Sequence, residues 1–140
     1  MLNFTMLADL GHTRAARHLT HLLQTPDTFV RIPLPGLLSG NAIVHAAPAL
    51  GAAFLAYTAE IAPGGKLLPG SDQRFVYVLE GEAHISGRSL DQSVSPGNFI
   101  FLSAEDSATC TAIAALRCFV LEKPYEALAG IPAPTAFTGC

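Results

Sequence analysis

Phe75-Val-Tyr-Val-Leu-Glu-Gly-Glu82 and Ser95-Pro-Gly-Asn-Phe-Ile-Phe-Leu102 are the two segments that decide the fold. Each joins a run of β-branched and aromatic residues to a turn that contains glycine, which is the pattern of a strand with a tight turn at one end. Neither strand has a polar face, whereas a half-exposed strand alternates apolar with polar residues. Both faces of these two strands must therefore be covered.

The core of a barrel covers the inner face of such strands, and the outer face needs a further partner. A second sheet or the N-terminal arm of the same chain is one candidate for that partner. A subunit or domain interface is the candidate that we favour, because large exposed apolar patches are rare on monomers. Only 14% of the residues are charged, against an average near 25%, which leaves little polar surface for a free monomer.

The rest of the chain repeats short β-type segments between turn-forming residues, with no long helical period, which is typical of a sandwich or barrel. We expect an irregular, proline-rich N-terminal arm (1–40), a β-barrel (41–126) and a linker-like tail (127–140) without a further element. The predicted strands are 42–45, 53–61, 74–79, 83–86, 99–102, 109–113 and 116–121.

Length and charge exclude several functions. The 140 residues predict one domain or one half of a larger protein. The net charge of −3, without a basic cluster, argues against nucleic-acid binding. No apolar run approaches the roughly 18 residues that cross a bilayer. The N-terminal residues 1–10 lack the basic region of a signal peptide, so we expect no membrane contact and a cytoplasmic location.

The three cysteines have neither a metal-binding spacing nor an even number for disulfides. If 113–116 forms a two-residue hairpin turn, Cys110 and Cys118 point to opposite faces and do not bridge. We expect Cys110, Cys118 and Cys140 to be buried, reduced thiols, because free cysteine behaves as a small hydrophobe.

Six stretches of the chain carry a family resemblance: His12-Thr-Arg14, Thr25-Pro-Asp-Thr-Phe-Val30, Pro35-Gly36, Ala49-Leu-Gly-Ala-Ala-Phe54, Phe75-Val-Tyr-Val-Leu-Glu-Gly81 and Leu121-Glu-Lys-Pro-Tyr125. The order of the turns and strands resembles the cupin superfamily, and with these stretches residues 11–134 resemble the N-terminal half of (S)-ureidoglycine aminohydrolase. This resemblance implies a single cupin-type double-stranded β-helix, a jelly-roll barrel.

What the resemblance implies differs between the two halves of such enzymes. They are manganese-dependent and release ammonia from ureidoglycine, giving ureidoglycolate, in allantoin and purine degradation. Their metal and substrate site belongs to the C-terminal cupin, and we expect this chain to end in the linker before it. No metal ligand of the family falls on a residue present here, so the resemblance assigns no catalytic residue and no cofactor to this chain.

The general cupin pattern asks for two histidines and a glutamate before the first turn and a third histidine after the second. Counting from the glycines of the two turns, the glutamate position falls on Arg74, the first two histidine positions fall in 67–70, and the third falls on Ala108. None of these is a metal donor, and arginine stays protonated. The sequence therefore predicts a barrel without metal.

Arg74 has the same strand parity as Val76, so both are expected to point into the barrel, and Arg74, Val76 and Ala108 are the predicted pocket-lining residues. Arg74 either grips a small acid or ureide as ligand, or pairs with Asp72 or Glu60 and closes the barrel mouth. We favour the pairing.

Three functions remain open. The favoured one is a metal-free cupin half, structural and oligomeric, paired with copies of itself or with a second cupin domain and inactive alone. The alternative is a small-molecule binding or sensor cupin with Arg74 in its pocket. A third is an active enzyme whose site is completed by a separately encoded C-terminal cupin.

Overall fold

The computed structural model describes residues 13–140, which divide into two units after Val30. The first unit contains a two-stranded antiparallel ribbon in which Ala16 lies opposite Leu23. A hydrogen bond of 2.9 Å joins the hydroxyls of Thr13 and Thr25 near its ends. Residues 1–12 of the predicted arm lie outside the described residues. From residue 13 onward, the elements of this unit are β1 (Ala16–Arg17), β2 (Leu22–Leu23) and the 3-10 turn η2 (Pro26–Thr28).

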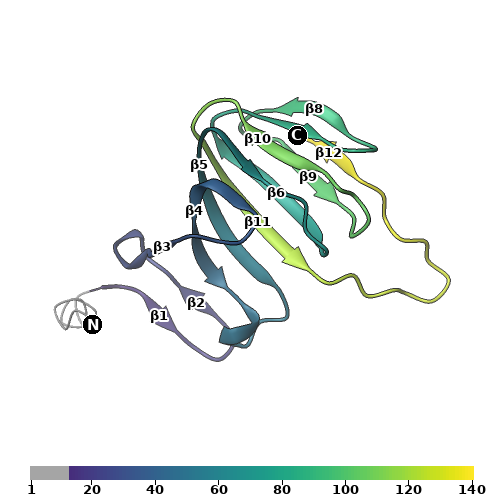
Figure 1. Ribbon diagram of the computed structural model, residues 1–140. Helices are drawn as coiled ribbons and strands as arrows, with labels where there is room; N and C mark the ends of the chain where they lie inside the picture. The colour runs from purple at the N-terminus through teal and green to yellow at the C-terminus, as the bar shows by residue number, and fades with distance from the viewer. Residues whose placement is uncertain (1–12) are drawn as a thin grey trace. The chain divides into compact units, whose positions relative to one another are not determined.

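The second unit, Arg31–Cys140, is built almost entirely from strands, and the sheets of Figure 1 confirm the predicted all-β class. Its one 3-10 turn is η3 (Pro48–Leu50). Its strands are β3 (Arg31–Ile32), β4 (Leu37–Ala46), β5 (Leu55–Leu67), β6 (Gln73–Glu80), β7 (Ala83–Ser86), β8 (Asp91–Val94), β9 (Phe99–Leu102), β10 (Thr109–Ala112), β11 (Leu116–Lys123) and β12 (Phe137–Gly139).

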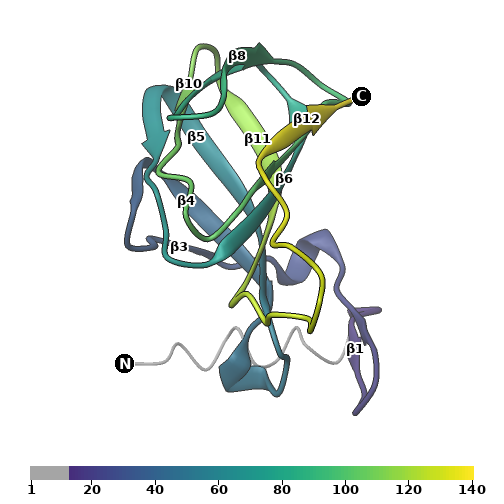
Figure 2. The ribbon, with the colours of Figure 1, turned by 90° about the vertical axis from the view of Figure 1, so that its right-hand side faces the viewer.

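These strands form one ten-stranded antiparallel sheet that curls onto itself (Figures 1 and 2). Its main order is β12-β9-β6-β11-β5-β10-β7-β8, with β4 also on β5 and β3 on β4. The two end strands, β12 and β8, come close enough for Gln92 Nε2 to donate a 2.6 Å hydrogen bond to Thr138 Oγ1. The curl therefore brings the free edges of the sheet together around one core.

The longest strand, β5, passes through the segment that the sequence indicated as a turn, Pro63-Gly-Gly65. β5 pairs with β11 before this point and with β10 after it, so the three residues form a corner between the two sides of the curled sheet. A Cβ on Gly65 would lie 2.5 Å from Ile61 Cγ2 and 2.7 Å from the carbonyl oxygen of Leu38. Glycine thus bends the strand here without ending it.

The predicted hairpin at 113–116 is wrong. β10 pairs with β7 and β5, and β11 pairs with β5 and β6, so the two strands are not partners. As a result Cys110 and Cys118 both face the same core, as free buried thiols, whereas Cys140 is exposed, contrary to expectation. Burial raises the pKa of Cys110 to about 11 and that of Cys118 to about 12, so both are protonated at neutral pH.

The ends of the predicted barrel also differ from the structure. The segment 31–40, which the sequence placed in the arm, contributes β3 and the first residues of β4 to the sheet. The tail was expected to hold no further element, but it contains β12, which pairs with β9 over Phe137–Gly139. Figure 2 shows this tail as the yellow end of the chain, which returns to the sheet after a segment without regular structure.

The core is made of aliphatic and small side chains from the inner face of the sheet. Its largest fully buried members include Ile85, Ile100 and Val120. None of the phenylalanines within residues 13–140 belongs to this buried core. Among those residues, moreover, no helix is long and apolar enough to cross a membrane.

Five of the eight phenylalanines lie on the outer face of β6, β9, β11 and β12 instead. The rings of Phe75 and Phe99 stack with centroids 5.7 Å apart, and those of Phe101 and Phe137 with centroids 5.4 Å apart. β12 therefore extends this face, because its Phe137 lies beside Phe101 on the neighbouring strand. We call the outer-face set the aromatic band: Phe75, Tyr77, Phe99, Phe101, Phe119 and Phe137.

Candidate functional site

The candidate site is the buried ion pair at one end of the sheet, between Arg74 on β6 and Glu122 on β11. The two residues lie directly opposite each other in the register of these strands. Strand alternation turns both inward, since Val76 and Val120 on the same faces belong to the core. Arg74 Nε donates a 2.8 Å hydrogen bond to Glu122 Oε1, and the side chains are only 8% and 18% exposed.

Two further groups fix this pair. Tyr57, from β5, donates a 2.8 Å hydrogen bond from its hydroxyl to the same Oε1 of Glu122. Arg74 Nη1 donates to the carbonyl oxygen of Leu68 at 2.9 Å. Burial, followed by the neighbouring carboxylate of Glu122, raises the pKa of Tyr57 far above its ordinary value, so the phenol remains a proton donor.

A cavity of about 230 Å³ opens beside the ion pair. Arg74 Nη2 and Glu122 Oε2 make no hydrogen bond with any described residue, and within residues 13–140 no fully buried side-chain nitrogen or oxygen lacks a partner. Both atoms are therefore accessible to solvent, and both side chains line the cavity. It is lined by Leu34, Pro35, Gly36, Leu55, Tyr57, Leu68, Pro69, Gly70, Ser71, Asp72, Arg74 and Glu122.

The three residues predicted from sequence occupy different places. Arg74 lines the cavity, whereas Val76 and Ala108 are core residues with 2% exposure and are not among its lining residues. The partner of Arg74 is Glu122, and not Asp72 or Glu60 as the sequence suggested. Glu60 accepts its hydrogen bonds from Arg31 instead.

The sequence reasoning missed Glu122 and Tyr57, although strand alternation carried a signal for both. Glu122 continues the inward set of β11, which contains Cys118 and Val120, and Tyr57 precedes the inward Ala59 by two residues.

The positions at which a cupin holds its metal do not fit a metal here. Arg74 places a guanidinium where a carboxylate ligand is expected, and that cation is fixed by Glu122 and Leu68. Ala108 offers no donor atom and is buried against Gly87. In the described part of the chain no group of three or more His, Cys, Asp or Glu side chains could hold a metal ion. A divalent cation at this place would meet a positive charge and too few donor atoms.

A serine, a histidine and an aspartate also meet on the β7-β8 hairpin, but they do not form a catalytic set. His84 Nε2 lies 2.6 Å from Asp91 Oδ1, while its Nδ1 lies 3.5 Å from Ser93 Oγ. The latter distance is long for a nucleophile and its base, and His84 and Asp91 are 42% and 72% exposed. None of the three lines the cavity at the ion pair. We interpret these contacts as surface hydrogen bonds that hold the β7-β8 hairpin.

Comparison with solved structures defines the class: the chain has the cupin fold. It superposes on protein YlbA from E. coli with a TM-score of 0.81, 24% identity, and coverage of 94% of this chain and 57% of the other. An RmlC-like cupin from Shewanella frigidimarina gives a TM-score of 0.63 at 11% identity, covering 81% of this chain and 96% of that one. The predicted cupin-type barrel is thus confirmed. No protein-family model matches the sequence.

In sequence the chain resembles (S)-ureidoglycine aminohydrolase. It is 28% identical over 128 residues to a rice protein (Oryza sativa subsp. japonica) described as a probable (S)-ureidoglycine aminohydrolase. The match covers 89% of this chain but only 41% of the rice protein, so the chain spans less than half the length of this relative.

Proposed function

We propose that this chain is a metal-free, non-catalytic cupin domain of a protein resembling ureidoglycine aminohydrolase, in the degradation of ureidoglycine and related purine products. The observation that carries the proposal is the Arg74–Glu122 ion pair, which occupies the place of a cupin metal ligand. A buried guanidinium in a hydrogen-bonded network is a structural element that a metal cannot replace without breaking the network. The chemistry would then belong to another domain.

The aromatic band supports a structural role in assembly. Its central residues Tyr77 and Phe119 lie opposite each other on neighbouring strands, and Tyr77 is 39% exposed. Leu79 and Phe137 extend the apolar surface with 40% and 50% exposure. Apolar surface of this kind is typical of interfaces, in which aromatic residues are enriched. We propose that a second copy or a second cupin domain covers it.

The absence of catalysis is tested by metal analysis together with an ammonia assay on ureidoglycine. We expect substoichiometric manganese in the purified chain and ammonia release no faster than the spontaneous reaction, because the ligand positions carry no donors. The rice relative, assayed in parallel, serves as the positive control. Stoichiometric manganese with catalysed ammonia release would contradict the proposal.

The structural role is tested by substituting Tyr77 with glutamate and measuring mass in solution by light scattering. A buried charge at the centre of an interface is expected to weaken self-association about tenfold or more. Ile113→Glu is the control, because Ile113 is 53% exposed in the turn after β10, outside the band. Equal self-association of the wild-type chain and the Tyr77→Glu variant would show that the band is not the interface between copies.

A second candidate function is favoured by the cavity at the ion pair. It combines apolar walls with a few polar atoms that are not used within the chain, which is the usual make-up of small-molecule sites. We therefore keep a binding or sensor role as the alternative proposal.

A further inference from the structure

We infer that the cavity beside Arg74 and Glu122 takes a small primary amine that also carries a neutral hydrogen-bond acceptor, and that it rejects carboxylates. This inference rests on the proposed binding role of the cavity. It differs from the ligand-binding alternative raised by the sequence, in which Arg74 grips a small acid or ureide.

The charge of the cavity lining decides the sign of the ligand. Arg74 is the one cation among the lining residues, and Glu122 already neutralises it through the 2.8 Å contact. Asp72 also lines the cavity, and its carboxylate has no hydrogen bond or ion pair with any described residue. One guanidinium therefore faces two carboxylates, and an anionic ligand would be repelled where an ammonium ion is attracted.

The hydrogen-bonding atoms of the lining that have no partner within the chain decide which polar groups the ligand must carry. Glu122 Oε2 and the oxygens of Asp72 are acceptors, and an ammonium group offers three donors and no acceptor. Arg74 Nη2 is a donor and is held in place, because Nε and Nη1 of the same side chain are already bonded. A hydroxyl or amide oxygen beside the amine would satisfy Nη2, since a neutral acceptor adds no charge.

Glycine at position 70 leaves room for that acceptor. A Cβ at this residue would lie 2.9 Å from Arg74 Nη2, so any larger side chain would crowd the free nitrogen. The hydrocarbon part of the ligand would lie against the apolar lining residues Leu34, Leu55 and Leu68. The cavity is thus built for a short aliphatic chain with a positive head.

The experiment uses probes of one chain length and different charge, titrated into the isotopically labelled full chain and followed by NMR. Propylamine and 3-amino-1-propanol represent the proposed class, and propionate and 1-propanol represent the anion and the neutral control. Ligands of about five heavy atoms are expected to bind with dissociation constants on the order of millimolar. We expect saturable shifts of Gly70, Ser71 and the Arg74 Nε–H signal with the two amines, strongest for 3-amino-1-propanol, and none with propionate.

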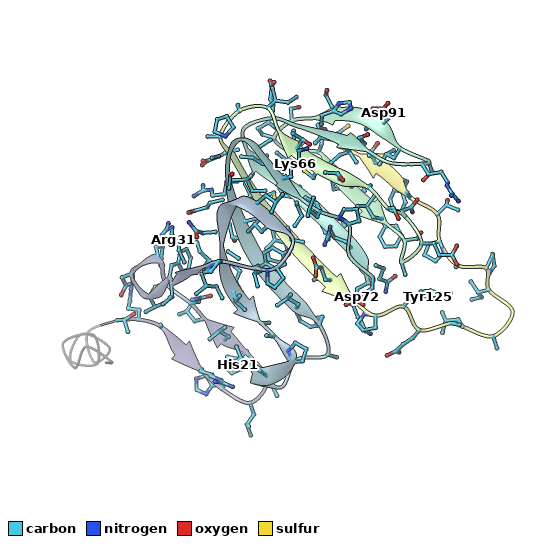
Figure 3. The ribbon with its side chains drawn as sticks, in the orientation of Figure 1. His21, Arg31, Lys66, Asp72, Asp91 and Tyr125 are labelled. Atoms are coloured by element: carbon cyan, nitrogen blue, oxygen red, sulfur yellow. The ribbon has the colours of Figure 1, made fainter. Side chains whose placement is uncertain are left out.

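Asp72→Asn is the test variant, because Asp72 takes no part in the ion pair. Loss of the negative charge of Asp72 is expected to weaken amine binding roughly five- to tenfold. The matched control is Asp91→Asn, which removes an exposed carboxylate at the opposite end of the second unit (Figure 3). Gly70→Ala is expected to remove the preference for the amino alcohol over the amine.

Propionate binding as tightly as propylamine would overturn the inference and leave a binding role intact. Saturation by none of the probes would overturn both this inference and the binding role, while the metal-free structural proposal would stand on its own tests. An Asp72→Asn variant that bound amines as well as the wild-type chain would likewise refute the assignment of the cavity.

Discussion

Replacing Arg74 by methionine is expected to lower the free energy of unfolding by about 3 kcal/mol, because removing one partner of a buried ion pair leaves the other charge uncompensated. Glu122 would lose its charged partner while remaining only 18% exposed, and the carbonyl oxygen of Leu68 would lose its donor. The figure lies at the lower end of the range for such pairs, because the adjoining cavity gives Glu122 some access to water. Urea unfolding followed by circular dichroism measures this change.

The chain provides a matched control on the same two strands. Here the arginine, Arg117, is on β11 and the glutamate, Glu80, is on β6. These side chains are 46% and 64% exposed. Arg117→Met is expected to cost less than about 1 kcal/mol, as is usual for exposed pairs.

The double variant Arg74→Met/Glu122→Gln should recover much of the loss, because it removes both charges and keeps an acceptor for Tyr57. Equal costs for Arg74→Met and Arg117→Met would show that the first pair is not buried in solution.

Alanine at Gly81 is expected to cost about 3–5 kcal/mol or to prevent folding, from backbone strain and steric overlap together. Gly81 has a φ of +85°, a backbone conformation that residues other than glycine rarely adopt. A Cβ there would lie 2.1 Å from the carbonyl oxygen of Ala115, which is main chain and cannot rotate away. The midpoint of urea unfolding, or the yield of folded protein, measures the effect.

Gly97 separates the two causes. Its φ of +89° is nearly the same, but nothing lies within 4 Å of an added Cβ. Gly97→Ala should therefore show only the strain, about 1–2 kcal/mol. A Gly81→Ala variant as stable as Gly97→Ala would mean that the turn after β6 does not pack against Ala115.

The sequence predicted local features well because strands and turns depend on neighbouring residues. Alternation along β6 correctly turned Val76 and Val78 inward, and the same parity placed Arg74 on the inner face. The pairing of strands that are distant in sequence could not be predicted in the same way. The segments around Cys110 and Cys118 are separated by a short turn and were taken for a hairpin, whereas the curled sheet places β5 between their strands.

The same distinction explains the site. The partner of Arg74 is 48 residues away in sequence, and Tyr57 is 65 residues from Glu122, so no spacing rule links these three side chains. A nearby acid such as Asp72 was the natural candidate, and it proved to line the cavity without joining the ion pair. β12 escaped prediction because three residues after a proline-containing tail give too short a pattern to show alternation.

The pairing of β12 with β9 has a consequence for the resistance of the protein to aggregation. β9 is Phe99-Ile-Phe-Leu102, uncharged and apolar on both faces, and β12 covers the backbone edge that it would otherwise present. Gly139 lies so close to the ring of Phe99 that a Cβ would approach its Cζ to 2.5 Å, which fits β12 closely over this segment. An open edge of this composition is a template for strand addition by another molecule. We therefore expect β12 to protect the edge of β9, and proteolytic loss of Phe137–Gly139 to make the protein more prone to aggregation through this strand.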